Sequence, residues 1–174
     1  MIEMITNYQS PVGELTLASD GEQLLGLWIA NQKYFGATLE QPAIVTNDLP
    51  IFDKTKSWLN QYFSGQRPDI VNLDLAPQGS EFRQVVWQLL SDIPYGEVMT
   101  YGHIAQKVAA YMGKPSMSSQ AVGAAIAHNP ISIIIPCHRV IAKSGSLTGY
   151  AGGLTNKAYL LNLEGVDMTK LFIP

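Results

Sequence analysis

The sequence contains a single cysteine, Cys137, among its 174 residues. A disulfide within the chain is therefore excluded, as is any zinc or iron–sulfur site that needs several cysteines. The three histidines, His103, His128 and His138, do not show the spacing of metal ligands. We therefore expect no bound metal in this protein.

The sequence also lacks an apolar run of the ~18 residues that a membrane-spanning helix needs. Residues Met1–Met4 show neither the basic nor the apolar region of a secretory signal. Hydrophobic residues make up 47% of the chain, a share that excludes intrinsic disorder and supplies a packed core. We expect a cytoplasmic, globular protein without a membrane partner.

The net charge of −3 argues weakly against nucleic acid as a partner, but the charges are unevenly distributed. Residues 1–75 hold four Lys and Arg against nine Asp and Glu, whereas residues 76–174 hold seven against five. A polyanion would therefore meet the second part of the chain. The alternative explanation is a chance asymmetry in a short sequence.

The patterning divides the chain into a domain of residues 1–75 and a domain of residues 76–174, with turn-forming residues at 76–80. In the first domain, alternating apolar residues separated by tight turns predict antiparallel strands within residues 4–29. Apolar residues at helical spacing then predict a helix over 51–63, which Gly65 ends. We expect an α/β domain with a small antiparallel sheet.

The second domain is predicted to be mainly α-helical. Apolar spacing indicates helices over 82–93, 101–112 and 119–128, and a last helix that Thr155 caps and that runs to about Glu164. The two middle helices, joined by a glycine-containing connector, fit a helix-turn-helix in a winged-helix-like domain, although the same pattern describes any helical hairpin. Ile131–Ile135 is β-branched and too short for a helix, so we expect an extended, buried strand there.

Cys137 follows this expected strand directly, in the sequence Pro136-Cys137-His138-Arg139. A lone cysteine in a cytoplasmic protein is most often a small buried hydrophobic residue. Here, however, the neighbouring His138 and Arg139 would stabilise a thiolate and lower the pKa of Cys137. Because adjacent residues of an extended chain point to opposite sides, His138 should not touch the sulfur directly, and if His138 is the base, a water between the two is the natural link.

Two further residues are candidates for proton transfer. On the last helix, an inward stripe at i, i+3, i+4 and i+7 spacing begins at Lys157 and ends at Glu164, whose carboxylate then needs a partner. A histidine beside the nucleophile is one such partner, and a frayed, solvated glutamate is the alternative. The phenol of Tyr101 can donate a proton to a heterocyclic leaving group, although most tyrosines at the start of a helix only pack.

Several motifs of the second domain together resemble one known family. Ile133–Ile141, with Pro-Cys-His-Arg at its centre, looks like the signature of O6-alkylguanine-DNA alkyltransferases, also called methylated-DNA–protein-cysteine methyltransferases. The match extends to Pro94–Val98, Ala121–Gly123, Asn129–Pro130, Gly149–Leu154, Lys157, Leu160–Leu161 and Glu164–Gly165. The resemblance is strong over about residues 76–165, whereas the first domain matches only in order and length.

The resemblance implies DNA repair by irreversible transfer of a methyl or alkyl group from O6-alkylguanine in double-stranded DNA, with O4-alkylthymine left open as a substrate. Cys137 would accept the group in a single turnover, and His138 would act on it through a water, with Glu164 behind the histidine. Tyr101 would protonate the guanine as it leaves. The reaction needs no cofactor, and a monomer suffices for it.

The same resemblance assigns residues to the substrate and to the DNA. Because a stacked base cannot reach a buried thiol, the alkylated guanine would be flipped out of the duplex. The substrate site would be formed by Asn129, Val140, Tyr150, Ala151 and Lys157, of which Asn129 would also tie the thiol-bearing strand to the helical hairpin. DNA contacts would come from Gln120, Ala121, Gly123, Ala124 and Arg139, and the small residues of this helix, Ala125 and Ala127 included, would allow close approach to the minor groove.

The sequence departs from the family pattern at two places. Gln120 stands where the family usually has an arginine that fills the space of the flipped base, and it lacks the charge and planar fork of arginine. The connector around Tyr111–Ser118 is also a few residues longer than usual. Two alternatives remain: a lesion-binding relative without transfer activity, although such proteins replace the nucleophile, and a cysteine hydrolase, which would need direct contact between Cys137 and His138.

Overall fold

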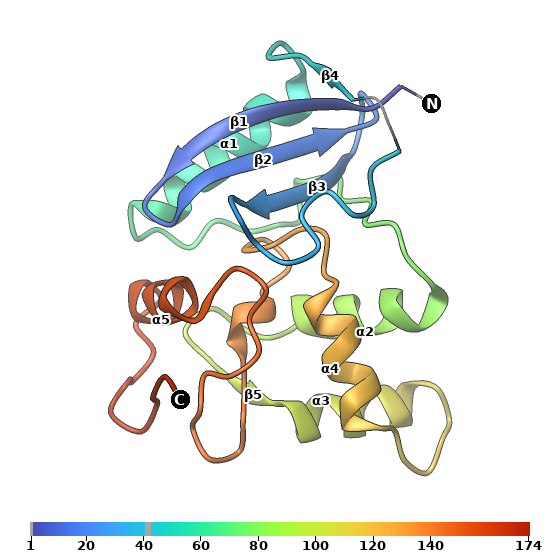
Figure 1. Cartoon of the computed structure of the whole chain (residues 1–174), viewed down its shortest axis with the longest axis vertical. Coiled ribbons are helices and arrows are strands. Elements are labelled where there is room, and N and C mark those ends of the chain that lie inside the picture. Colours follow the sequence, from blue (N-terminus) through green and yellow to red (C-terminus); the bar gives the residue numbers. More distant parts are fainter. Residues whose placement is uncertain (1, 41–42) are drawn as a thin grey trace. The chain divides into compact units, whose positions relative to one another are not determined.

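The computed structural model of the protein describes residues 2–40 and 43–174 (Figure 1), which form two compact units. The first unit comprises the residues up to Gln78 together with Pro130–Ser132. The second unit comprises Gly79–Asn129 and Ile133–Pro174. In the described residues, no helix is long and apolar enough to cross a membrane.

The first unit is a four-stranded sheet with one long helix against it. The sheet has the order β3-β2-β1-β4, and its elements are β1 (Met4–Ser10), β2 (Gly13–Ser19), β3 (Leu24–Ile29) and β4 (Ile44–Val45), followed by α1 (Pro50–Phe63). The first three strands pair antiparallel, as predicted, but β4 pairs parallel with β1. The sheet is therefore mixed, and the prediction of a purely antiparallel sheet is wrong on this point. The sequence could not reveal β4, because a strand of two residues carries no alternating pattern.

The predicted helix over 51–63 is confirmed by α1, which packs against β1 and β2 (Figure 1). One face of the helix is buried, including Phe52, Leu59 and Tyr62, and it covers strand residues such as Leu15 and Leu17. Apolar residues recur every 3.6 positions on the helix and every second position on the strands, so each element has one apolar face, and the two faces pack together as one core.

The second unit is mainly helical, as predicted. Its elements are α2 (Glu81–Ser91), β5 (Met99–Thr100), α3 (Tyr101–Tyr111), α4 (Ser119–Ala127), β6 (Val140–Ile141) and α5 (Leu154–Leu163). Thr100 and Ser118 accept hydrogen bonds from backbone N–H groups of α3 and α4 and are the N-caps of these two helices. Helices α2, α3 and α4 pack on one another, and Trp87 Nε1 on α2 donates to the Ala125 carbonyl on α4 at 2.8 Å.

Two local predictions for this part of the chain are wrong. Ile131–Ile135 is buried but is not a strand, since only Ile131 pairs, through a single bridge to Leu27. Ile133 has a φ of +72°, a left-handed conformation that ends the extended backbone, and Cys137–Arg139 forms a short 3₁₀ helix. The last helix begins at Leu154, and its N-cap is Gly153 rather than Thr155.

Candidate active site

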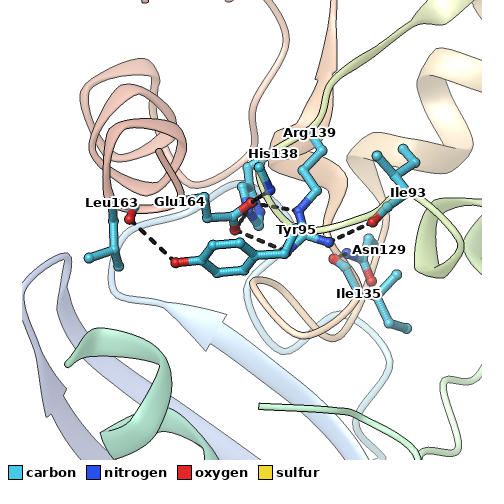
Figure 2. A network of polar contacts seen from close by, with 9 residues as sticks. Ile93, Tyr95, Asn129, Ile135, His138, Arg139, Leu163 and Glu164 are labelled. Carbon is cyan, nitrogen blue, oxygen red and sulfur yellow. Dashed lines mark hydrogen bonds and ion pairs between the residues drawn. The ribbon is translucent and has the colours of Figure 1, made fainter. Parts of the chain in front are cut away.

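The Cys137 thiol lies at the first residue of the 3₁₀ helix and is buried, with 4% of the residue exposed. Asn129, just after α4, donates from Nδ2 to the Ile135 carbonyl at 2.8 Å (Figure 2) and is also hydrogen-bonded to the thiol. One amide side chain therefore fixes both the turn that precedes Cys137 and the sulfur itself. This is the tie between the thiol-bearing segment and the helical hairpin that the resemblance implied, made by a turn instead of a strand.

Burial raises the pKa of the Cys137 thiol, and the Asn129 hydrogen bond and the charge of Lys157 act against this rise. The prediction that His138 and Arg139 lower this pKa is therefore wrong. Both side chains are instead engaged with Glu164. The groups that favour the thiolate come from distant parts of the sequence.

His138 and Glu164 form a fully buried pair. Nε2 of His138 lies 2.6 Å from Oε2 of Glu164, and neither side chain is exposed (Figure 2). The inward stripe of α5 is as predicted, since Lys157, Leu160 and Leu161 are buried and Glu164 is the buried C-cap residue. Because the carboxylate accepts from Nε2–H, the other ring nitrogen, Nδ1, is a bare acceptor, and within the described residues it is buried without a hydrogen-bond partner.

Arg139 holds the same carboxylate from another side. Its Nε donates to Oε1 of Glu164 at 2.7 Å and its Nη2 donates to Oε2 at 3.1 Å, while Nη1 donates to the Ile93 carbonyl at 2.7 Å. Figure 2 shows Tyr95 next to this group, with the Arg139 guanidinium carbon 5.7 Å from the centre of the Tyr95 ring. Sequence reasoning assigned Arg139 to DNA and gave Tyr95 no role, although the Pro94–Val98 motif contains it.

Tyr101 and Lys157 lie on another side of the site, close to Thr148–Gly149. The Tyr101 hydroxyl lies 2.9 Å from the Thr148 carbonyl and 3.0 Å from the Gly149 carbonyl. A Cβ on Gly149 would be 2.6 Å from that hydroxyl, so glycine is what permits this approach. Burial and the nearby Cys137 raise the pKa of Tyr101 to about 12, which keeps its proton in place at neutral pH.

Lys157 is buried on α5, and its ammonium donates to the Val140 carbonyl at 2.5 Å. Burial lowers the pKa of Lys157 to about 8, although Cys137 acts to raise it. The Lys157 Nζ also lies 5.9 Å from the centre of the Tyr101 ring. Lys157 thus brings a positive charge close to both the thiol and the phenol.

Tyr150 closes the site on the loop before α5. It is buried, its ring lies edge-on to His138 at 6.4 Å between centroids, and its hydroxyl has no hydrogen-bond partner within the described residues. The next residue, Ala151, is half-buried. All the residues expected to hold the substrate lie in the second unit of the fold, which also contains Cys137: Asn129, Val140, Tyr150, Ala151 and Lys157.

The helix expected to contact DNA, α4, exposes part of its surface. Gln120, Ala121 and Ala124 are exposed and Gly123 is half-buried, so these four residues are accessible. Ala125 faces inward at 3% exposure, and its expected place on the accessible surface is therefore wrong. Its carbonyl accepts the hydrogen bond from Trp87 that fixes α4 against α2.

Comparison with known proteins gives one consistent result. The family model described as 6-O-methylguanine DNA methyltransferase, ribonuclease-like domain, matches residues 4–77, and the model for the DNA binding domain of the same protein matches residues 81–166. Proteins named methylated-DNA–protein-cysteine methyltransferase are similar: that of Haemophilus influenzae is 41% identical over 92% of this chain and 86% of its own length. That of Mycobacterium bovis is 45% identical over 89% of this chain and 88% of its own length.

A solved structure gives the same result at the level of the fold. The crystal structure of Mycobacterium tuberculosis OGT in complex with DNA matches with a TM-score of 0.80 and 37% identity, over 98% of this chain and 95% of that one. The family matches together span both units of the fold. The chain belongs to the 6-O-methylguanine DNA methyltransferase family.

Proposed function

We propose that this protein repairs DNA by direct transfer of a methyl or larger alkyl group from O6-alkylguanine in double-stranded DNA to Cys137. The observation that carries the proposal is the buried pair of His138 and Glu164, 2.6 Å apart, whose histidine directly follows the only cysteine of the chain. Family membership and the curated names of the relatives favour the same reaction. The lesion-binding alternative is not favoured, because those relatives are named methyltransferases and Cys137 is present.

The chemistry follows from the protonation states of the site. The bare Nδ1 of His138 accepts the thiol proton through a water, and Glu164 stabilises the imidazolium that results. The Cys137 sulfur then attacks the alkyl carbon, so an S–C bond forms as the bond from that carbon to O6 of guanine breaks. Tyr101 donates a proton to the guanine ring, and guanine leaves as a neutral base. Since a thioether has no leaving route, each molecule reacts once.

The substrate reaches this thiol only as a flipped base. With Cys137 4% exposed, a guanine stacked in a duplex cannot bring its O6 substituent to the sulfur. We assign the pocket for the flipped base to Asn129, Val140, Tyr150, Ala151 and Lys157. The accessible residues Gln120, Ala121, Gly123 and Ala124 on α4 then lie against the minor groove, where small side chains permit close approach.

The proposed setting is the cytoplasm, and the proposed acting species is a monomer without a cofactor. A catalytic thiol needs a reducing compartment to stay reduced. All the groups assigned to the reaction come from one chain and one unit of the fold. Neither a second copy nor a bound group is required for the steps above.

The test is to incubate the protein with duplex DNA that contains one O6-methylguanine and to weigh the peptide that contains Cys137. We expect a gain of one methyl group, stoichiometric with repaired guanine, and no gain in the Cys137→Ser variant. A folded wild-type protein that binds the lesion without gaining mass would support the lesion-binding alternative. Steady turnover of an activated ester would instead support a cysteine hydrolase.

A further inference from the structure

The side chain of Arg139 makes its hydrogen bonds inside the second unit of the fold. Its side chain is 12% exposed, and all three of its nitrogens donate hydrogen bonds, two to Glu164 and one to the Ile93 carbonyl. The two bonds to Glu164 form the planar, bidentate pair that arginine makes with a carboxylate and lysine cannot make. Arg139, although it is next to His138 in the sequence, therefore uses its guanidinium to bind the carboxylate of Glu164.

The buried charges explain why a second partner for Glu164 is needed. Burial lowers the pKa of His138, which keeps the imidazole neutral at neutral pH even though Glu164 acts in the other direction. A neutral His138 leaves the negative charge of the buried Glu164 uncompensated, which is strongly unfavourable unless a cation is near. Arg139, whose guanidinium never loses its proton in proteins, supplies that cation.

Other ionisable groups surround the pair, and none of them replaces Arg139. Lys157 on α5 acts on His138 and on Cys137, but its ammonium donates to the carbonyls of Val140 and Thr148. Tyr150, on the loop before α5, feels the charges of both Cys137 and Glu164 and stays protonated because its pKa is raised. Tyr95 lies under the guanidinium and donates its hydroxyl to the Leu163 carbonyl at 3.3 Å.

The turn after α2 contacts the same carboxylate, at the oxygen that also accepts from Nε of Arg139. The Gly96 N–H lies 3.4 Å from Oε1 of Glu164, and the Ile93 carbonyl in the same turn accepts from Arg139. Gly96 has a φ of +82°, and a Cβ there would lie 3.1 Å from the Glu164 carbonyl oxygen. The turn, the guanidinium and the end of α5 thus fix the position of Glu164 together (Figure 2).

We propose that Arg139 is a positioning residue for alkyl transfer, which acts through Glu164. Its fork holds the carboxylate against Nε2 of His138, and its fixed charge lets Glu164 stay ionised while His138 stays neutral. A neutral His138 with a bare Nδ1 is the form that can accept the proton of Cys137. This inference rests on the proposed function, because it assumes that His138 and Glu164 take part in the transfer.

A double-mutant cycle tests whether Arg139 acts through Glu164. Single-turnover transfer rates are measured for the wild type, Arg139→Gln, Glu164→Gln and the double variant, on duplex DNA with O6-methylguanine. We expect Arg139→Gln to slow transfer about tenfold in the wild type but less than about twofold in the Glu164→Gln background. Equal losses in both backgrounds would overturn the proposal. Lys54→Gln, on the exposed surface of α1, is the matched control and should transfer at the wild-type rate.

The pH dependence separates positioning from a purely structural role. Without the cation, the His138–Glu164 pair takes up a proton more readily, so the acid limb of the rate profile should move to higher pH in Arg139→Gln. Arg139→Lys keeps the charge but loses the fork, so its acid limb should stay near the wild-type position while its maximal rate falls. A merely structural role would lower the rate of both variants without moving either limb, and that result would overturn the proposal.

Folding of the variants is checked by circular dichroism and by binding to the damaged duplex. If Arg139→Gln does not fold, Arg139→Lys carries the test alone, and a wild-type rate in that variant contradicts the need for the fork. Absence of transfer in the wild type would refute the proposed function itself. Transfer by the wild type with an additive cycle would refute only the role of Arg139.

Discussion

The Cys137 thiol has to ionise at a place where burial opposes its ionisation. The cation that lowers the pKa of this thiol is Lys157. Burial lowers the pKa of Lys157 itself to about 8, so its ammonium is still protonated at neutral pH. With the thiol neutral, the ammonium is a buried cation that two backbone carbonyls solvate. Ionisation of Cys137 places a negative charge beside it, and each group then stabilises the charged form of the other. The thiolate is thus favoured by a charge already in place.

Tyr101 gives a prediction at the level of a single residue. Tyr101→Phe keeps the ring beside Lys157 and removes only the hydroxyl, so we expect transfer to slow about a hundredfold, the contribution of a general acid. Because the pKa of Tyr101 is raised to about 12, the hydroxyl stays protonated between pH 6 and 9, and the ratio of the two rates should be constant there. Single-turnover kinetics on O6-methylguanine duplexes measure both quantities.

The control for this prediction is Tyr111→Phe at the far end of α3, where the tyrosine is 63% exposed. It should transfer at the wild-type rate. A wild-type rate in Tyr101→Phe would remove the phenol from the mechanism. A ratio that changed with pH would show that Tyr101 itself titrates in this range.

Sequence reasoning reached some of these residues and not others, for a physical reason. Glu164 could be placed next to a histidine because helical spacing put it on the inward stripe of α5, and a buried carboxylate needs a partner. The partners of Arg139 could not be predicted, since Ile93 and Glu164 lie 46 and 25 positions away and meet it only through packing. The backbone at Ile133 was missed because its left-handed conformation contradicts the residue's own preference.

At the scale of elements, α4 differs from the other helices in the size of its accessible side chains. Its buried residues Val122, Ala125 and Ile126 pack inward, while Ala121, Gly123 and Ala124 leave a surface without bulky groups. A helix gains nothing from glycine at its centre, where glycine costs about 1 kcal/mol relative to alanine. The glycine therefore points to a need for close approach from outside.

Gly123 allows this need to be tested apart from stability. No atom lies within 4 Å of where its Cβ would be, and leucine has a higher helix propensity than glycine, so we expect Gly123→Leu to fold. If α4 lies against the minor groove, the leucine blocks close approach, and affinity for duplex DNA should fall about tenfold or more. Fluorescence anisotropy with a labelled duplex, beside thermal unfolding, measures the two effects.

Asn162→Leu on α5 is the matched control, because it adds a leucine at another exposed helical position. It should leave DNA binding unchanged. Undiminished binding by Gly123→Leu would show that DNA does not meet this face of α4.

The elements themselves were predicted well where their periodicity extends over several turns. The helices and the first three strands have the expected bounds within a few residues, because each carries its own pattern of buried positions. β4 and the turn over 132–135 were not predicted, because both are too short to carry a periodic pattern. The parallel pairing of β4 and the left-handed backbone of Ile133 are set by contacts with distant parts of the chain. The antiparallel sheet was therefore predicted only in part.

At the scale of the whole molecule, the buried ionisable pair links the site to global stability. In the folded protein the pKa of Glu164 is lowered, because its hydrogen bonds and attraction to His138 and Arg139 outweigh burial, and the pKa of His138 is lowered by burial. Both groups therefore bind fewer protons in the folded than in the unfolded chain, so stability must rise with pH through their ranges. For Glu164, the stabilisation is complete above about pH 4.5 and is lost as the pH falls below it.

This gives a prediction for acid unfolding that one substitution isolates. Between pH 6 and pH 3 protonation of the Glu164 carboxylate by itself should cost the wild type ~2 kcal/mol of its free energy of unfolding, a loss that Glu164→Gln, which has no carboxylate to protonate, does not undergo. All other carboxylates are common to the two proteins and cancel in the difference, but His138 does not, because Glu164 raises its pKa; the same two curves are therefore also measured in a His138→Asn background, where only the carboxylate differs. Urea unfolding followed by circular dichroism at several pH values gives the two curves. Parallel curves would mean that Glu164 titrates in the folded protein as it does in the unfolded chain, a result that neither the bidentate arginine nor the 2.6 Å histidine contact permits.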